Sequence, residues 1–250
     1  MINNTNNSSE KHRLFPKTGI ELKMMIRNEI TKNGPSADLN HIDVSNIEDF
    51  SGMFYGYNFY GDISEWDVSN ARSMREMFYD STFNGDISDW DVSNVKNMKY
   101  MFCGCRSFNQ DLSGWDVSNV KDMSFMFYGA KNFNGDISTW DVRNVEDMQS
   151  MFGLCIKFNC NLKRWNTKNV RNMRAMFAGC KEFNQDLSRW NVSNVTNMKS
   201  MFHDCKVFSQ DLSGWDVSNV TDMRYMFYGC DSFNHGLPDW IVTSKLFNKT

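Results

Sequence analysis

Proline and long apolar stretches are what this 250-residue chain has least of. Its three prolines are Pro16, Pro35 and Pro238, so every residue from 36 to 237 keeps a backbone N–H that a ladder of hydrogen bonds needs. No run of about 18 apolar residues occurs, which predicts that the chain does not insert into a membrane. The polar N-terminal segment lacks a charged start followed by an apolar run, so no secretion signal is expected.

A large net charge and a set of catalytic residues are also missing. The chain has 27 basic and 30 acidic residues, a net charge of −3, so we expect no DNA binding, and any anion recognition must be local. No Ser-His-Asp, Cys-His, glycine-rich phosphate loop or paired-carboxylate arrangement stands apart from the repeats described below. The sequence therefore predicts a protein that is not an enzyme, and it indicates no cofactor.

What the chain has in abundance is self-similarity. The decapeptide DLSGWDVSNV occupies residues 111–120 and recurs unchanged at 211–220, and all eight tryptophans lie 24 or 25 residues apart. The full repeat reads (I/L)-S-x-W-D-V-S-N-V-x-x-M-x-x-M-F-x-x-C-x-x-F-N-(G/Q)-D, and a ninth copy begins at Leu237. One repeat of this size is too small to bury its own apolar face, so neighbouring repeats must stack.

Two segments of each repeat predict secondary structure. The residues W-D-V alternate in burial as a short strand does, and the apolar positions of V-x-x-M-x-x-M-F fall on one side of a short helix or 3₁₀ segment. We therefore predict an α/β repeat solenoid, a leucine-rich-repeat-like stack of about eight and a half rungs of 24–25 residues with an N-terminal capping helix. Parallel strands at their usual spacing would make this stack about 40 Å long.

The ends of the chain differ from the repeats. Thr18-Gly19-Ile20-Glu21 is a capping-box pattern, and Asn33-Gly34-Pro35 is a helix stop, so an amphipathic helix is expected over 18–33. Such a helix would cover the first rung. The predicted regions are a disordered tail at 1–12, an N-terminal helical cap at 13–38, an eight-repeat solenoid at 39–236 and a C-terminal half-repeat cap at 237–250.

The repeat resembles a known family. The order L-x-x-W-x-V-x-N-V is similar to the leucine-rich-repeat consensus shortened by one residue. With DVSNVTDMRYMFYGC at 216–230 and FNGDIS at 83–88, it resembles the 25-residue branch of the BspA-like leucine-rich-repeat surface proteins over roughly residues 39–242. The resemblance implies a non-catalytic interaction solenoid, often at a cell surface, with adhesion or partner binding as its usual role. The missing secretion signal leaves a cytoplasmic location as the alternative.

One column of the lattice consists of cysteines, interrupted once by alanine. Stacked cysteines come within disulfide range of one another, so bridges between adjacent rungs are one interpretation. The other is a buried column of free thiols that serve as small apolar fillers. Alanine in the column favours free thiols. The column comprises Cys105, Ala130, Cys155, Cys180, Cys205 and Cys230.

Carboxylates form two further columns. Oxygen-rich rungs could bind Ca²⁺, or each side chain could accept an N–H hydrogen bond in its own turn. Asparagine replaces aspartate three times, which favours the hydrogen-bond acceptor. One column, after the tryptophan, has Asp67, Asp91, Asp116, Asp141 and Asp216, with Asn166 and Asn191. The other, at the turn, has Asp62, Asp86, Asp111, Asp136, Asp186 and Asp211, with Asn161.

One rung departs from the consensus in its charge. Residues 161–174 read NLKRWNTKNVRNMR and contain five basic and no acidic residues. This basic rung either balances the acidic columns as a solvated face or forms a patch that recognises an anion. With one neighbour from each adjacent rung, the candidate partner-binding residues are Arg143, Lys163, Arg164, Lys168, Arg171, Arg174 and Arg189.

These observations favour a non-catalytic binding module over the other classes of function. The expected partner is a protein or an acidic glycan, and the chain is expected to be a monomer. The alternative is a structural acidic rod or spacer, stabilised by Ca²⁺ if the carboxylate columns bind it. A rod would have equivalent rungs, and the basic rung contradicts that equivalence.

Overall fold

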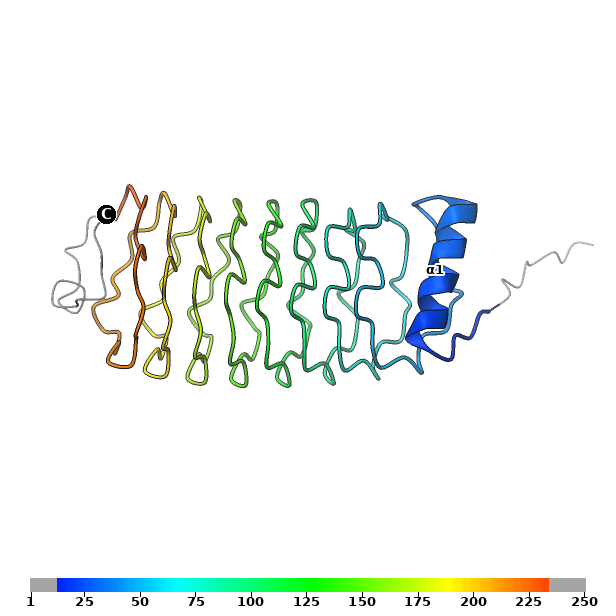
Figure 1. Cartoon of the computed structure of the whole chain (residues 1–250), viewed down its shortest axis with the longest axis horizontal. Coiled ribbons are helices and arrows are strands. Elements are labelled where there is room, and N and C mark those ends of the chain that lie inside the picture. The colour runs from blue at the N-terminus through cyan, green and yellow to red at the C-terminus, as the bar shows by residue number, and fades with distance from the viewer. Residues whose placement is uncertain (1–12, 234–250) are drawn as a thin grey trace, which may run out of the picture.

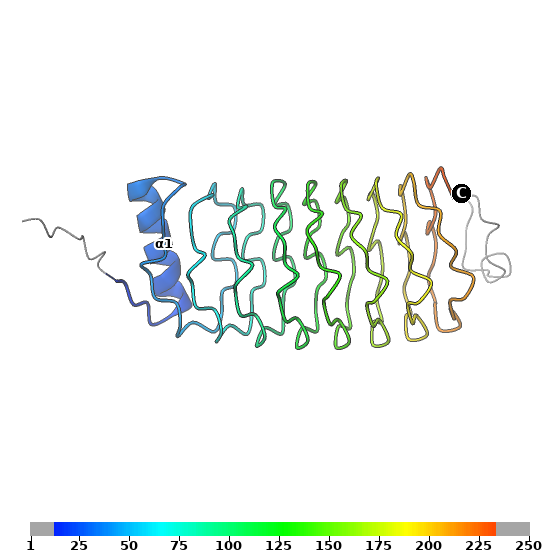
Figure 2. The same cartoon turned by 180° about the vertical axis from the view of Figure 1, so that it is seen from behind.

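The computed structural model of the chain describes residues 13–233 as a row of similar coils with one helix at its N-terminal end (Figure 1). The same row is seen from behind in Figure 2. We number the rungs one to eight, each beginning at its turn residue, at 38, 62, 86, 111, 136, 161, 186 and 211. The predicted disordered tail at 1–12 and the predicted C-terminal cap at 237–250 lie outside the described residues.

Helix α1 spans Gly19–Asn33, within the range that the capping pattern predicts. The Thr18 hydroxyl accepts the N–H of Glu21 at 3.2 Å, which satisfies one of the free donors of the first turn. The Glu21 carboxylate accepts the N–H of Lys17 at 2.7 Å. At the other end, Gly34 has a φ of 84° and donates its N–H to Ile30. No helix in the part of the chain described here is long and apolar enough to cross a membrane.

One side of α1 packs against rung one. Leu22 and Ile26 have no exposed surface, whereas Met24, on the outer side, is 61% exposed. A Cβ built on Gly19 would lie 3.1 Å from the carbonyl oxygen of Asp49 and 3.2 Å from the Met53 methyl group, so the helix start touches the rung directly. The helix therefore buries the apolar surface that rung one would otherwise expose.

Successive rungs pair in parallel through one bridge position that recurs in every rung, and two further parallel bridges, Leu14–Ile42 and Asp38–Asp62, lie at the N-terminal end. The bridge residue lies just before the first methionine of the repeat, six positions after the aspartate of W-D-V. Within residues 13–233 the pairing forms isolated bridges rather than extended strands. The rung-to-rung series is Asp49, Ser73, Asn97, Asp122, Asp147, Asn172, Asn197 and Asp222.

The prediction that W-D-V forms a strand is therefore wrong. In rung four the Trp115 N–H bonds to the Leu112 carbonyl at 3.0 Å, and the Val120 N–H bonds to the Val117 carbonyl at 2.9 Å. These turn hydrogen bonds bracket W-D-V and leave it too short to pair as a strand. The alternation in burial was nonetheless correct, because Trp115 and Val117 are buried and Asp116 is exposed.

The prediction of a helix or 3₁₀ segment at V-x-x-M-x-x-M-F is also wrong. In rung four, Phe125 and Gly129 adopt the left-handed conformation, with φ of 58° and 72°. A left-handed residue every fourth position interrupts a helix, and the segment becomes a run of turns. Alternate N–H groups then reach rung five at 2.7–3.0 Å, from Met123, Phe125, Phe127 and Gly129 to Asp147, Gln149, Met151 and Gly153.

The core consists of aromatic columns that run through the rungs. Neighbouring tryptophan rings stack with centroids 6.2–6.4 Å apart. The phenylalanines after the second methionine stack at 5.3–5.8 Å. Each indole N–H from Trp66 to Trp215 donates to the carbonyl of the leucine or isoleucine one rung back, at 2.8–3.2 Å. The columns therefore set the register as well as filling the core.

Asparagine side chains add a polar ladder at the corner after W-D-V-S. The Asn119 side-chain amide donates to the carbonyl of Ser93 in the preceding rung at 2.8 Å, and Asn169 donates likewise to Arg143 at 2.7 Å. The same bond recurs from Asn70 to Asn219. Each corner is thus tied to the rung before it.

The seven cysteines are free thiols. In the lattice column each thiol donates to the carbonyl of a core phenylalanine one rung back at 2.7–2.9 Å, a bond that requires the proton. Burial raises the pKa of these thiols, that of Cys230 to about 12. The column therefore serves as small buried fillers with one hydrogen bond each.

Candidate functional site

The seven predicted partner-binding residues, called the basic strip below, lie on the outside of rungs five to seven. Leu162, Trp165 and Val170 of rung six remain buried, so the basic side chains occupy the outward positions. The chain turns at 163–164 and again at 168–169, which divides the strip between two corners. Arg171 and Arg174 lie beyond the second corner.

The stacking places basic residues of adjacent rungs next to one another. Rungs five, six and seven pair 25 residues apart, so Arg164 and Arg189 occupy the same position at the first corner. Arg143 and Lys168 occupy the same position at the second corner. The structure therefore brings these four residues together as two neighbouring pairs, while Arg171 and Arg174 continue along rung six.

Two members of the strip are already neutralised. Arg143 pairs with Asp141 of its own rung at 2.7 Å, and Lys163 pairs with Asp186 of rung seven at 2.6 Å. The hydrogen bond from Arg143 lowers the pKa of the Asp141 carboxyl, and that from Lys163 lowers the pKa of Asp186. Arg143 and Lys163 therefore balance carboxylates of the acidic columns, which is the first of the two interpretations of the basic rung.

The other five basic residues have no ion pair within residues 13–233. Their side chains are exposed and retain their donors for solvent or for a partner. The five are Arg164, Lys168, Arg171, Arg174 and Arg189, which are absent from every ion pair of the described chain. Rung six therefore carries most of the uncompensated positive charge of this face.

Asparagine keeps the turns of rung six while removing two negative charges. Asn161 accepts the N–H of Lys163 at 3.0 Å, and Asn166 accepts that of Lys168 at 3.3 Å. In rung four the carboxylate of Asp116 makes the equivalent bond to Ser118 at 2.9 Å. Rung six therefore has the same turn scaffold as its neighbours and a different charge.

The carboxylate columns hold turns. Eight of the column aspartates are the candidate calcium ligands, and in each of them one oxygen accepts the N–H two residues ahead at 2.8–3.2 Å. They are Asp62, Asp67, Asp86, Asp91, Asp111, Asp116, Asp136 and Asp141. These backbone bonds are the largest cause that lowers the pKa of Asp62, Asp86 and Asp136. Within the part of the chain that the structure describes, no three acidic, histidine or cysteine side chains are grouped to hold a metal ion.

We expect Ca²⁺ to leave the stability of this protein unchanged. One oxygen of each column carboxylate is already engaged in its own turn, so a cation would gain few ligands. The measurement is the melting temperature in millimolar CaCl₂ and in excess chelator, at matched ionic strength. A rise of several degrees that is specific to Ca²⁺ over Mg²⁺ would contradict this assignment.

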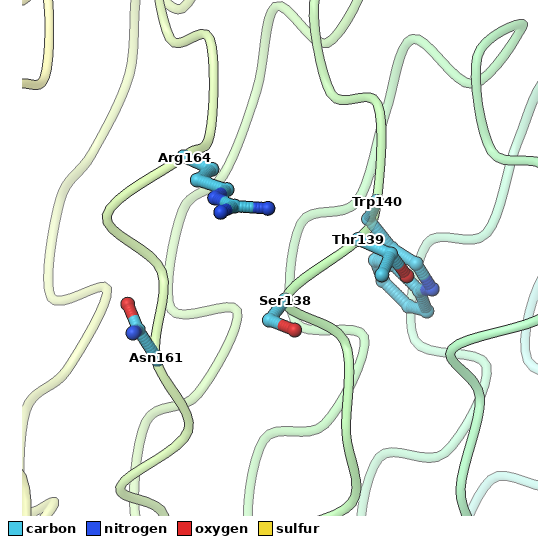
Figure 3. A pocket seen from close by; sticks show the side chains of 5 residues that line it. All are labelled: Ser138, Thr139, Trp140, Asn161 and Arg164. Atoms are coloured by element: carbon cyan, nitrogen blue, oxygen red, sulfur yellow. The ribbon is translucent and has the colours of Figure 1, made fainter.

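A hollow of about 400 Å³ lies beside the basic strip, between rungs five and six (Figure 3). Ser138, Thr139 and Trp140 line it from rung five, and Asn161 and Arg164 line it from the following turn. Of these residues, sequence reasoning selected only Arg164 as a binding residue. The sequence feature that could have indicated the hollow is Asn161, which stands where the other junctions have a turn aspartate.

A second hollow and an aromatic surface lie on rungs one to four, away from the basic strip. The hollow, of about 360 Å³, is lined by Asp80, Ser81, Thr82, Gly104, Arg106 and Ser107. Beside it, Tyr55 and Tyr79 stack at 4.7 Å, and Tyr100 and Phe125 stack at the same distance. Sequence reasoning selected none of these residues.

Comparison with known proteins identifies the repeat. The model of the family described as "Mycoplasma protein of unknown function, DUF285" matches residues 21–138, 110–194 and 155–249, which together are more than half of the chain. The chain belongs to this family. The three DUF285 segments overlap one another, and the basic strip lies within the second and third. No curated protein and no solved structure gives a significant match.

Proposed function

We propose that this protein is a non-catalytic binding module, a leucine-rich-repeat-like solenoid whose basic strip recognises an acidic protein or glycan. The observation that supports the proposal most is the set of five exposed basic residues without ion pairs. Four of them are on rung six and Arg189 is on rung seven, and rung six keeps the turns and, apart from Thr167, the buried residues of its neighbours. A recognition surface requires exposed residues whose charge differs from one rung to another while the backbone that supports them stays the same.

The electrostatics of rung six fit recognition better than folding. An exposed ion pair contributes only about 0–1 kcal/mol to stability, so these five unpaired cations, four on rung six and one on rung seven, gain nothing for the fold. Facing an anionic partner, they would accelerate association and oppose partners of like charge. The interaction should weaken as salt rises, because the Debye length falls to about 8 Å at 0.15 M ionic strength.

The similarity to BspA-like surface proteins is consistent with this proposal. Those proteins use leucine-rich repeats for adhesion or partner binding, and this chain shares the L-x-x-W-x-V-x-N-V order at 112–120. We propose the same class of role here. The proposal rests on the charged residues of rung six and is independent of the compartment.

Charge reversal of the strip tests the proposed function. We expect the triple variant Lys163→Glu, Arg164→Glu, Lys168→Glu to bind a partner captured from the source cells at least 100-fold more weakly, a loss of about 3 kcal/mol. The measurement is the dissociation constant of the purified partner, by biolayer interferometry at two salt concentrations. The melting temperature should fall only slightly, because all three side chains are at the surface and the ion pair of Lys163 with Asp186 that the variant breaks contributes at most about 1 kcal/mol.

A matched control reverses three cations elsewhere. Lys96, Lys121 and Lys131 are exposed residues of rungs three and four, and their triple Glu variant has the same net charge as the test variant. It should bind the partner as the natural chain does. A partner that binds both triple variants equally well contradicts the proposed function.

A further inference from the structure

The hollow between rungs five and six differs in charge from every equivalent junction. At the position of Asn161, the other junctions between the eight rungs carry Asp62, Asp86, Asp111, Asp136, Asp186 and Asp211. This junction is therefore the one where the turn residue is neutral. At the position of Arg164, rungs two to four have Glu65, Asp89 and Gly114 instead. A carboxylate has been removed and a guanidinium added at the same place.

Two groups in the hollow have hydrogen-bond donors to spare. The Asn161 side-chain oxygen accepts the Lys163 N–H, and its NH₂ group donates no hydrogen bond within residues 13–233. Arg164 is exposed and forms no ion pair in that range. Figure 3 shows its side chain reaching from its own turn toward the preceding rung, over the space that Ser138 and Thr139 border.

The remaining residues of the hollow shape it. Trp140 is 3% exposed and donates its indole N–H to the Leu112 carbonyl at 2.8 Å, and the Thr139 hydroxyl donates to the Ser113 carbonyl at 2.8 Å. Ser138 donates its N–H to Asp136 at 2.8 Å. Asp136 is the turn carboxylate of rung five, and this bond from Ser138 holds it in its own turn.

This donor set suits a tetrahedral oxyanion. A guanidinium presents a planar fork of N–H groups that binds two oxygens of a phosphate or sulfate at once. The Asn161 amide supplies a donor for a third oxygen. A hollow of about 400 Å³ exceeds one such group, which leaves room for bridging water and for the molecule that carries the group.

We propose that the hollow lined by Ser138, Thr139, Trp140, Asn161 and Arg164 binds one sulfate or phosphate group carried by the partner of the basic strip. The inference rests on the proposed function and deepens it, because it names the chemical group that the strip recognises. Lys168 and Arg189 then contact further anionic groups of the same partner. The selectivity for oxyanions is set by Arg164 and Asn161.

The test uses the full chain and inorganic anions. Sodium sulfate and sodium phosphate are titrated at constant ionic strength, with chloride as the balancing ion, while NMR follows the Asn161 side-chain NH₂ and the Arg164 Nε–H. We expect saturable shifts with both oxyanions and none with chloride. A sulfated disaccharide and a phosphoserine peptide, titrated in the same way, distinguish a glycan source of the group from a protein source.

Asn161→Asp is the decisive variant, because it should fold. Aspartate makes the same turn bond at this position in the other rungs, as Asp111 does to Ser113 at 2.8 Å. We expect N161D and R164Q each to weaken oxyanion binding at least 10-fold. The matched control is Asn166→Asp, which adds the same charge on the same rung but does not line the hollow, and it should bind within about threefold of the natural chain.

The outcomes separate this inference from the proposed function. Shifts no larger than those in chloride, or equal shifts of the Arg164 Nε–H in N161D and the natural chain, overturn the oxyanion site. If the partner is still lost on triple charge reversal in that case, the strip binds anions without this hollow and the proposed function survives. If sulfate binds in the hollow and the triple variant keeps its partner, the proposed function fails and the oxyanion site stands.

Discussion

Proline at Ala175 is expected to lower the free energy of unfolding by at least about 3 kcal/mol. Ala175 has a φ of 52°, which a proline ring forbids, and its N–H donates to the Lys199 carbonyl of rung seven at 2.8 Å. The substitution would therefore remove a rung-to-rung bond and force the turn to rearrange. Urea unfolding followed by tryptophan fluorescence measures the loss.

Glycine at the same position is the matched control, with the opposite sign. A left-handed conformation costs a non-glycine residue about 1–2 kcal/mol, and glycine's greater freedom in the unfolded chain offsets part of that gain. Ala175→Gly should therefore raise the free energy of unfolding by about 0.5–1 kcal/mol. If both variants proved neutral, the run of turns assigned to this segment would be incorrect.

Alanine at Phe152 should be comparably damaging, with a loss of about 3–5 kcal/mol in the free energy of unfolding. Phe152 is fully buried in the middle of the stack. Its ring stacks on Phe127 at 5.8 Å and on Phe177 at 5.7 Å, and it also contacts Phe158 at 4.0 Å. Removing it opens a cavity that touches the rungs on both sides.

The control for Phe152→Ala is an aromatic side chain outside the core. Tyr60 is 57% exposed, so Tyr60→Ala should cost less than about 1 kcal/mol. In a stack whose stability comes from contacts between neighbours, the Phe152 variant should also unfold in two steps, as the halves on either side separate. A loss as small as that of the Tyr60 variant would show that the aromatic columns do not carry the stability.

Burial could be predicted from the sequence far better than backbone conformation. The lattice correctly indicated that Trp115, Val117, Met123 and Phe127 are buried, and the capping box placed α1. The i, i+3 spacing of methionines is shared by a helix and by a run of turns. Only left-handed residues distinguish the two, and glycine signals them in some rungs, as at Gly129, but not at Phe125.

Only the charged part of the candidate site could be predicted from the sequence. A change of charge on a fixed lattice marks rung six directly, so the basic strip could be read from residues 161–174. The ion pair between Lys163 and Asp186 could not be predicted, because it depends on the conformations of two side chains on adjacent rungs. The hollow could not be predicted either. Ser138 and Thr139 carry no unusual signal in the sequence of rung five, and they line the hollow only because rung six packs beside them.

Scaffold and specificity are thus separate in this chain. The identical segments 111–120 and 211–220 supply leucine, tryptophan and valine to the core, and their aspartates and asparagines hold turns and tie the rungs together. The altered segment 161–170 keeps those contacts, with Thr167 buried in place of valine. Apart from Thr167, the residues that differ from 111–120 lie at the surface.

Exchange of that one segment tests the central claim most directly. Replacing NLKRWNTKNV at 161–170 by DLSGWDVSNV from 111–120 restores a consensus rung and removes three cations of the strip. The measurement is the affinity of the exchanged chain for the captured partner, beside its melting temperature. We predict a melting temperature at least as high as that of the natural chain and binding reduced at least 100-fold, about 3 kcal/mol. Undiminished binding by the exchanged chain would contradict the account.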